Sequence, residues 1–314
     1  MLLIVVAIYG VLWHLTIKRL WKVGVVQILV RSHSSGDGLM QSLWNNDGPL
    51  SSMPRITVHT SLQESSKGAP LIAVGGAITS TTLRNVTESN VPIKFLFFQT
   101  LMPTFCRTAS PNFVYAFYLA YDASDWVFAD RRLHDAFLRQ FHSMTTSGTC
   151  LQRNISANLS LLKCEHSGKP TWAQNDAMLE AYLDNVDYFY RVNDDTQMLT
   201  AGWTEKFISA LERYDPQRVG VVGPKHSGGN VGILTYDFVH RTHVDIFGFY
   251  YPHLFTDWWG DNWITCVYKP NRSTKISEVR LQHTLGLGRR YSVNWHVEKH
   301  LSNQLAHDID VVNR

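Results

Sequence analysis

The sequence predicts an α/β fold, because segments with strand character alternate with segments of helical spacing. The clearest strand covers residues 188–192, which are aromatic and β-branched and are followed at once by Asn193, Asp194 and Asp195. A predicted helix over 171–183 leads into this strand, and a second helix over 204–214 follows it. In α/β sheets, ligands bind beyond the carboxyl ends of the strands, so the acidic end of this strand is a candidate site.

The other expected strands follow from short apolar runs that stop at turn or polar residues. The run over 71–74 is predicted to end at Gly75 and Gly76, and a later one ends at Asp122, a second acidic residue at a strand end. The last strand alternates polar and apolar residues, as an edge strand does, and ends at His283. Together these predict strands over residues 71–74, 93–98, 113–121, 188–192, 219–222 and 279–283.

Helices are predicted where apolar residues recur every three or four positions. Residues 131–144 show this spacing. The helix over 171–183 follows Pro170, and Thr171 with Gln174 resembles a capping box. Alanine recurs along that helix at every fourth position, which allows close packing on a sheet. The residues that carry these patterns are Leu133, Phe137, Leu138 and Phe141; Ala173, Ala177 and Ala181; and Phe207, Ile208 and Leu211.

Composition limits the classes of function. The 314 residues are 45% hydrophobic, 18% charged and 12% aromatic, with a formal charge of +3, which is typical of a globular protein. They suffice for one large domain or two smaller ones. There is no dense run of Lys or Arg, so nucleic acid is not expected as a partner.

Four cysteines allow two disulfides, or four buried thiols. None is part of a CxxC pair, so a structural zinc site is not expected. A bond between Cys150 and Cys164 would close a short loop that contains two N-x-S/T sequons, at Asn154 and Asn158. Further sequons at Asn85 and Asn271 fit the same secretory interpretation.

The N-terminal third divides into an apolar segment and a polar one. Residues 1–30 are predicted as a signal anchor, with a buried helix as the alternative, because 2–13 are uninterrupted apolar. Residues 31–68 are rich in Ser, Gly and Asn and are predicted as a flexible stem before a catalytic domain over 69–314. Basic residues at 18–22 would keep the following chain cytoplasmic by the positive-inside rule, which conflicts with the sequons.

Two pairs of acidic residues are candidate binding or catalytic residues. Asp194 and Asp195 repel each other at a strand end, and Mn2+ or Mg2+ would relieve that repulsion, with a solvated turn as the alternative. Downstream, Asp257 and Asp261 lie within an aromatic cluster over 247–263, a combination that is common in sugar-binding sites and also in a dense core. His240 and His243 are expected to be ordinary core or surface histidines.

Together, the acidic strand end, the downstream stretch TDWWGDNW and the late histidine resemble metal-dependent glycosyltransferases of the GT-A fold, over roughly residues 69–300. The resemblance implies a GT-A-like mixed sheet with flanking helices. It implies that Asn193 and Asp194 contact the nucleotide sugar, and that Asp195 and His283 bind the metal. Asn193 stands where the family motif has Asp, so the site carries less negative charge.

The same resemblance assigns the remaining roles. Asp261 is the expected base for the acceptor hydroxyl, with Asp257 as the other candidate, while Trp172 and Asp122 are expected beside the nucleotide. The implied activity is an inverting transfer from a nucleotide sugar, with UDP favoured, to a glycan or glycoprotein, supported by Mn2+ or Mg2+. The implied location is the Golgi or ER membrane, with a lumenal catalytic domain and the N-terminus in the membrane.

Two alternatives remain at this point. Paired carboxylates at a strand end also serve metal-dependent nucleotidyl or phosphoryl transfer, although no P-loop or Lys-rich motif is present. A non-catalytic carbohydrate-binding protein of the same fold is the other, and Asn193 is the residue that favours it.

Overall fold

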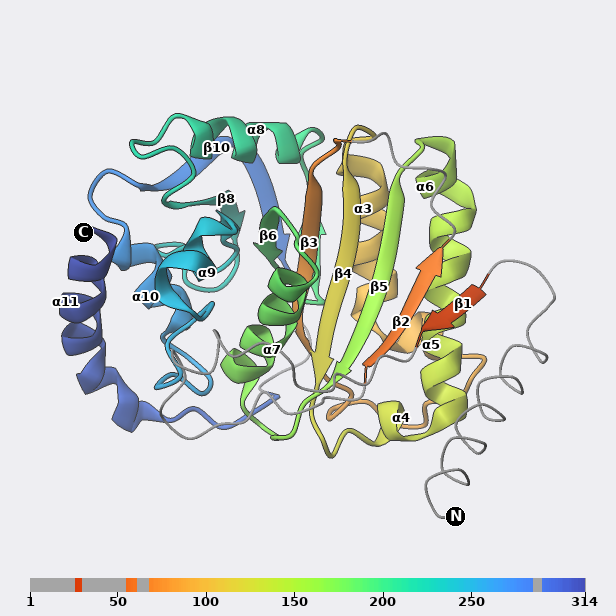
Figure 1. The fold of residues 1–314 in the computed structure, drawn as a ribbon. Coiled ribbons are helices and arrows are strands. Elements are labelled where there is room, and N and C mark those ends of the chain that lie inside the picture. The colour runs from red at the N-terminus through yellow and green to blue at the C-terminus, as the bar shows by residue number, and fades with distance from the viewer. Residues whose placement is uncertain (1–25, 30–54, 61–67, 285–289, 314) are drawn as a thin grey trace, which may run out of the picture.

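The computed structural model describes residues 26–29, 55–60, 68–284 and 290–313 (Figure 1). All strands belong to one mixed sheet in the order β1-β2-β5-β4-β3-β6-β9-β8-β10-β7. The predicted α/β fold, a mixed sheet with flanking helices, is confirmed. The strands are β1 (Val26–Leu29), β2 (Arg55–Thr60), β3 (Leu71–Ile78), β4 (Val114–Tyr121), β5 (Ser156–Lys163), β6 (Tyr188–Arg191), β7 (Thr196–Met198), β8 (Val221–Ser227), β9 (Phe238–His240) and β10 (Ser273–His283).

Six of the strands between β2 and β7 in this order point in the same direction. β3, β4, β5 and β6 are mutually parallel, and β9 is antiparallel to both β6 and β8, so β8 and its parallel neighbour β10 run with the first four. Their carboxyl ends therefore meet at one edge of the sheet, toward which the arrowheads of β4 and β5 point in Figure 1. That edge is where a ligand site is expected.

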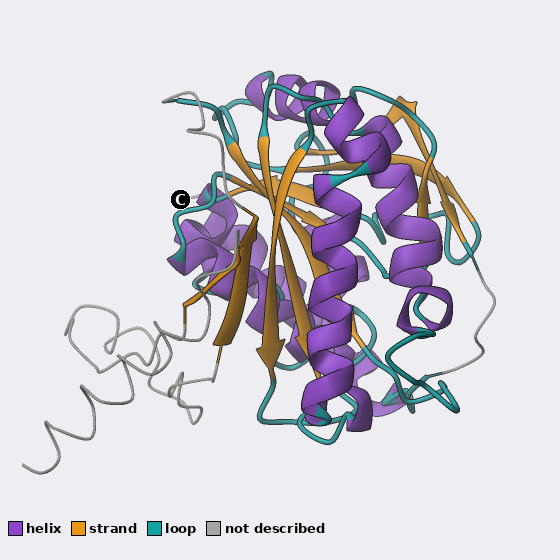
Figure 2. Cartoon of the chain, turned by 90° about the vertical axis from the view of Figure 1, so that its right-hand side faces the viewer, coloured by secondary structure: helices purple, strands orange, loops and turns teal. Residues whose placement is uncertain are grey.

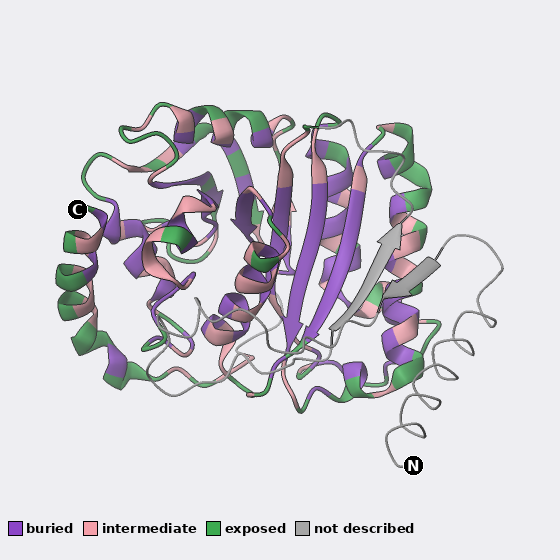
Figure 3. Cartoon of the chain, viewed as in Figure 1, coloured by how far each residue is buried: buried purple, intermediate pink, exposed green. Residues whose placement is uncertain are grey.

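Helices cover both faces of the sheet (Figure 2). On one face, β3 residues Ile72 and Val74 join a core with α2, η1, α3, α5 and α8, and on the other face Ala73 joins a core with α7, α9, α10 and α11. The central strands are buried on both faces, whereas α5 and α11 expose their outer sides (Figure 3). The helices are α2 (Val91–Lys94), the π-helical turn η1 (Phe97–Leu101), α3 (Met102–Thr108), α4 (Trp126–Ala129), α5 (Arg131–Thr146), α6 (Gly148–Gln152), α7 (Pro170–Leu183), α8 (Trp203–Glu212), α9 (Thr242–Phe247), α10 (Gly260–Val267), the 3-10 helix η2 (Trp295–His300) and α11 (Leu301–Val312).

Helix α7 packs on β3 and β4 through its alanine stripe, as predicted, and all three alanines are buried. The prediction of a capping box is wrong. The helix begins with Pro170, and its N-cap, Lys169, makes no side-chain cap. Thr171 therefore lies inside the first turn, and its hydroxyl donates to the Asp257 carbonyl oxygen at 2.7 Å. This bond joins the helix start to the aromatic, acidic segment.

The strand predicted over 93–98 is wrong, because these residues are helical. Pro92 lies in the first turn of α2, and the chain continues through η1 into α3. Phe95, Phe97 and Phe98 pack against Phe137 of α5, with ring centroids 4.5–5.5 Å apart. Periodicity does not separate a short apolar run in a buried helix from one in a strand, and the aromatic packing decides the outcome.

Strand β3 continues through the two glycines that were predicted to end it. At Gly75 a Cβ would lie 2.1 Å from the Tyr118 carbonyl oxygen of β4, and φ is +151°. Glycine therefore allows a close approach of two strands here, where a turn was expected.

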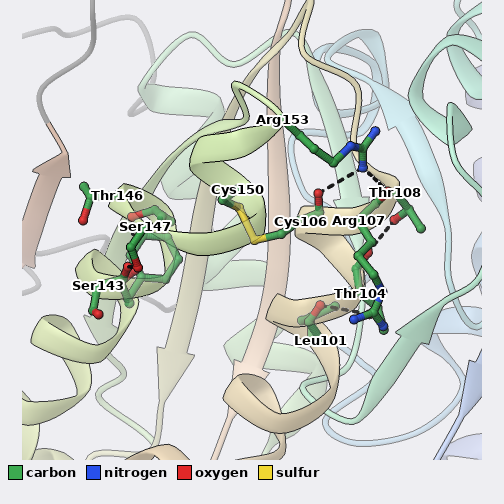
Figure 4. Close-up of a disulfide and its surroundings, with 12 residues drawn as sticks. Leu101, Thr104, Cys106, Arg107, Thr108, Ser143, Thr146, Ser147, Cys150 and Arg153 are labelled. Carbon is green, nitrogen blue, oxygen red and sulfur yellow. Dashed lines mark hydrogen bonds between the residues drawn. A yellow bond between two sulfur atoms is a disulfide. The ribbon is translucent and has the colours of Figure 1, made fainter.

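The predicted Cys150–Cys164 bond is wrong. Cys150 of α6 pairs with Cys106 of α3, and Arg153 donates to the carbonyl oxygens of Cys106 and Arg107 (Figure 4). Most of the residues between Cys150 and Cys164 form β5, inside the sheet, whereas the sequon residue Asn154 is exposed in the turn before that strand. The sequon residue Asn158 is 9% exposed in that strand.

The sheet also takes up part of the predicted stem. β2 pairs antiparallel with β5, and β1, from the segment predicted as an anchor, pairs with β2. Residues 1–25 and most of the remaining stem lie outside the described residues. Within the ranges that the structure describes, no helix is both long and apolar enough to cross a membrane.

Candidate functional site

A cavity of about 650 Å3 opens at the edge where the parallel strands end. It is lined by residues that follow β3, β4, β6, β8 and β10, by the start of α7, and by the segment around the start of α10. Seven of the eight predicted site residues line it: Asp122, Asn193, Asp194, Asp195, Asp257, Asp261 and His283. The structure therefore brings them together, and their roles remain predictions.

The turn after β6 positions the predicted metal ligands. Beyond Asp195 the chain returns as β7, which pairs antiparallel with β10 and places His283 opposite Thr196. β10 lies between β8 and β7, so the predicted edge strand is wrong, because the short β7 covers its outer side. The result is that His283 Nε2 lies 3.3 Å from Asp195 Oδ1.

Asp195 and His283 suit a divalent cation. Asp195 is 5% exposed, and its Oδ1, the atom that faces His283, has no hydrogen-bond partner among the described residues. A buried carboxylate oxygen without a donor is costly unless a cation satisfies it. A carboxylate and an imidazole would supply two ligands, and diphosphate oxygens and water would fill the other positions.

Arg290 occupies the neighbouring carboxylate. Its NH1 donates to both oxygens of Asp194 at 2.9 Å, and its NH2 lies 3.6 Å from Asp195 Oδ2. Burial raises the pKa of Asp194, and the Arg290 charge opposes that shift. A guanidinium in this place is also a suitable partner for phosphate.

The two candidate bases differ in how far their oxygens are already engaged. Asp257 accepts from the backbone N–H of Trp258 at 2.8 Å and of Asn294 at 3.1 and 3.2 Å, and from the Thr256 hydroxyl. Asp261 accepts from the N–H of Asn262 at 3.0 Å and, at 3.4 Å, from the Thr235 hydroxyl. Asp261 therefore has the freer carboxylate.

Burial raises the pKa of Asp261, and the nearby Arg191 guanidinium opposes that shift. A carboxyl group whose pKa is raised toward neutrality is a better proton acceptor than an ordinary aspartate. Asp261 thus combines an accessible oxygen with increased basicity.

Arg191 is a buried cation at the floor of the cavity. It is the last residue of β6, its NH1 donates to the Thr235 carbonyl oxygen, and its Nε has no hydrogen-bond partner among the described residues. Beneath it, Asp237 accepts hydrogen bonds from the hydroxyls of Tyr250 and Tyr251. This buried network holds a positive charge, the Arg191 guanidinium, in the lining of the cavity.

Aromatic side chains form the rim beside Asp261. Trp258 is 38% exposed and Trp295 54% exposed, and their ring centroids lie 5.2 Å apart in an edge-to-face arrangement. Trp258 Nε1 donates to the Tyr291 hydroxyl at 3.0 Å. Trp259 also lines the cavity, and its Nε1 is buried without a partner in the described part of the chain. Exposed indoles of this kind are suitable surfaces for sugar rings.

The last two predicted residues differ in position. Asp122 lines the cavity and accepts from the N–H of Gly168 at 2.9 Å, so it also holds the loop before α7. Trp172 does not line the cavity. Its Nε1 donates to the His253 carbonyl oxygen at 2.8 Å, and the Lys169 ammonium lies 3.7 Å from its ring centroid.

His240 and His243 lie away from the cavity lining, as expected. His243 is buried between the Tyr268 hydroxyl and the Tyr250 carbonyl oxygen, and burial lowers its pKa to about 4.

Sequence reasoning missed Arg191 and Arg290. Arg191 carries a signal in the sequence, because it is the one charged residue in the otherwise apolar stretch 188–192. Arg290 carries none, since it follows a Gly-rich segment without periodicity and reaches Asp194 only through the fold.

Comparison with known proteins adds little to this geometry. No family model matches the chain, and no curated protein matches it. Among solved structures, the crystal structure of S. aureus TarS aligns with 11% identity and a TM-score of 0.43, over 78% of this chain and 42% of that chain. The chain thus spans less than half the length of that neighbour.

Proposed function

We propose that the chain is a glycosyltransferase that moves a sugar from a nucleotide-sugar donor to a hydroxyl acceptor, with inversion. The observation that carries the proposal is the cavity in which Asp195, His283, Arg290 and Asp261 converge, with the exposed Trp258 in its lining. Such a cavity offers groups for a diphosphate on one side and a base beside a sugar-binding surface on the other.

Different residues of this chain have different roles in the proposed reaction. Asp261 accepts the proton of the acceptor hydroxyl as its oxygen attacks the anomeric carbon, and the bond from that carbon to the diphosphate oxygen breaks. Arg290 and Arg191 are placed to stabilise the negative charge that the departing diphosphate gains. The Trp258 and Trp295 rings are suitable to orient the acceptor.

A divalent cation, Mn2+ or Mg2+, held by Asp195 and His283 would add Lewis-acid stabilisation to the diphosphate. UDP is the favoured nucleotide, and a glycan or glycoprotein is the favoured acceptor. The support for the cation is Asp195 Oδ1, which has no hydrogen bond among the described residues and faces His283 Nε2 at 3.3 Å.

We also propose that the chain works in the secretory pathway, attached to a Golgi or ER membrane by its N-terminal segment. The Cys106–Cys150 disulfide supports this, since such bonds persist in oxidising compartments.

Calorimetry with UDP and GDP tests the nucleotide site directly. We expect the wild-type chain to bind UDP with Mn2+ present and to lose that binding in EDTA or with Asp195→Asn, because the cation joins the diphosphate to the protein. Asp135→Asn, on the exposed side of α5, is the matched control and should bind as the wild type does. If neither nucleotide binds in any condition while the chain is folded, the transferase proposal fails.

Arg290 favours a second candidate, a carbohydrate-binding protein that needs no metal. Its guanidinium already neutralises Asp194 and approaches Asp195, as a cation would. In that case glycan binding would be equal with Mn2+ and with EDTA, no nucleotide would bind, and Trp258→Ala would weaken glycan binding.

A further inference from the structure

A second group of metal-ligating side chains lies outside the lining of the cavity. Cys164 and His166 follow β5 directly, and Asp176 lies in the second turn of α7. One ligand atom from each lies within 4.8 Å of the others, and His166 Nε2 is 3.0 Å from Asp176 Oδ2. In the described part of the chain, no other three His, Cys, Asp or Glu side chains meet in this way.

We propose that Cys164, His166 and Asp176 bind a zinc ion, with water as the fourth ligand. A thiolate, an imidazole and a carboxylate are the three side-chain types that bind Zn2+ in proteins. In a tetrahedral zinc site, ligand atoms about 2.0–2.3 Å from the metal lie roughly 3.3–3.7 Å apart. The His166–Asp176 distance of 3.0 Å lies just below this range and the 4.8 Å limit lies above it, so side-chain rotation would bring the three atoms to the spacing that the ion requires.

The state of these side chains supports a ligand. Cys164 is 1% exposed and forms no disulfide, so it is a buried thiol beside a carboxylate. His166 uses Nε2 toward Asp176, while its Nδ1 is buried and lacks a hydrogen-bond partner among the described residues. Because Nε2 is turned toward Asp176, it is the ring nitrogen that would bind the ion together with the carboxylate and the thiol.

The thiolate separates this site from the one at Asp195. Soft sulfur ligands favour zinc over Mg2+ and Mn2+, whereas the Asp195 site offers oxygen and nitrogen. Two cations of different chemistry would therefore bind at two places in the same chain.

The position gives the ion a structural role. It would join the end of β5 to α7 across residues 165–169. Gly168 and Lys169 of this connection, and Pro170 and Thr171 at the start of α7, line the cavity. Zinc would thus fix one wall of the cavity together with the bond from Gly168 to Asp122. The absence of a CxxC pair argued against a zinc site in the sequence. That pattern finds only ligands that are close in sequence, whereas the ligands here come from two separate elements.

Metal titration of the full chain tests the inference. We expect the metal-free protein to bind one Zn2+ per chain by mass spectrometry of metal content, and to show a thiolate-to-cobalt charge-transfer band with Co2+. Cys164→Ser and His166→Gln should lose the bound zinc, and Cys164→Ser should lose the band. Cys266→Ser, which removes the other free thiol, should keep both.

Two further measurements make the result independent of whether a variant folds and of metal binding at Asp195. Asp195→Asn should still bind one zinc, because that residue belongs to the other site. The cobalt spectrum of the wild-type chain needs no substitution at all, so a misfolded Cys164→Ser protein does not remove the test. A wild-type chain that binds no zinc and gives no thiolate band, or a folded Cys164→Ser chain that binds zinc as the wild type does, overturns the proposal.

Discussion

Asp257 and Asp261 lie four residues apart, yet the fold gives them different hydrogen-bond partners. The oxygens of Asp257 accept hydrogen bonds from the backbone N–H groups of Trp258 and Asn294. This side chain therefore holds the segment after residue 290 against the start of α10. Asp261 has weaker partners and lines the cavity with a carboxylate that is open to a ligand. At this scale, the number of donors already bound is the reason that Asp261, and not Asp257, is the proposed base.

We expect Asp261→Asn to lower kcat by about 10^2- to 10^4-fold, the usual contribution of a general base, while UDP binding stays unchanged. Steady-state rates and calorimetry on the same protein measure the two quantities. A pH profile adds a signature of the base. Because burial raises the pKa of Asp261, and the base acts when deprotonated, kcat/KM should rise with pH through a value above that of an ordinary aspartate. The asparagine variant should lack that limb, and a variant that keeps wild-type turnover would rule out Asp261.

At the scale of elements, the register of short strands decides which residues meet. β7 has three residues, and its pairing with β10 places His283 beside the turn that carries Asp195. The N–H of Thr284 also donates to the Asp195 carbonyl oxygen at 3.2 Å, which fixes this turn. A strand of three residues leaves almost no periodic signal, so the sequence predicted both partners but not the strand that joins them.

The disulfide between α3 and α6 belongs to this scale as well. It connects residues 44 positions apart, so its removal by Cys106→Ser with Cys150→Ser should lower the free energy of unfolding by about 2–5 kcal/mol. Thermal unfolding should show the midpoint falling for the double variant. A reductant should destabilise the wild-type chain and leave the double variant unchanged, while Cys266→Ser serves as the control. Equal midpoints for all three proteins would contradict the bond.

At the scale of the whole molecule, the sequence predicted what local pattern encodes. The helix over 131–144 was found because its apolar face is regular, and the strand over 113–121 because it is an unbroken apolar run. The acidic strand end was found because polar oxygens interrupt an apolar run. The helical residues 93–98, the Cys106–Cys150 pairing and the contact of Arg290 with Asp194 depend on packing between distant segments. Those contacts have no local signature, so they could not be predicted.

The same long-range packing buries a charge network whose titration should affect the stability of the whole chain. Asp237 is fully buried among the hydroxyls of Tyr250 and Tyr251, with Arg191 and Asp261 nearby. Burial raises the pKa of Asp237 from 3.8 to about 6, with Arg191 and the two tyrosine hydrogen bonds opposing the shift. The folded chain therefore binds a proton more tightly than the unfolded chain between these values.

By linkage, the stability that this proton provides is complete below the pKa of the unfolded chain and is lost as pH rises through about 6. The contribution is about 3 kcal/mol at 1.36 kcal/mol per pKa unit. Urea unfolding of the wild type and Asp237→Asn from pH 4 to pH 7 measures it. Burial also raises the pKa values of Asp194 and Asp261, so the wild-type slope contains their contributions too, and only the difference between the two proteins is assigned to Asp237. The wild-type chain should lose more stability over this range than the variant, whereas Asp135→Asn should keep the wild-type slope. Parallel curves for the wild type and Asp237→Asn would show that the carboxyl group keeps its ordinary pKa in the folded chain.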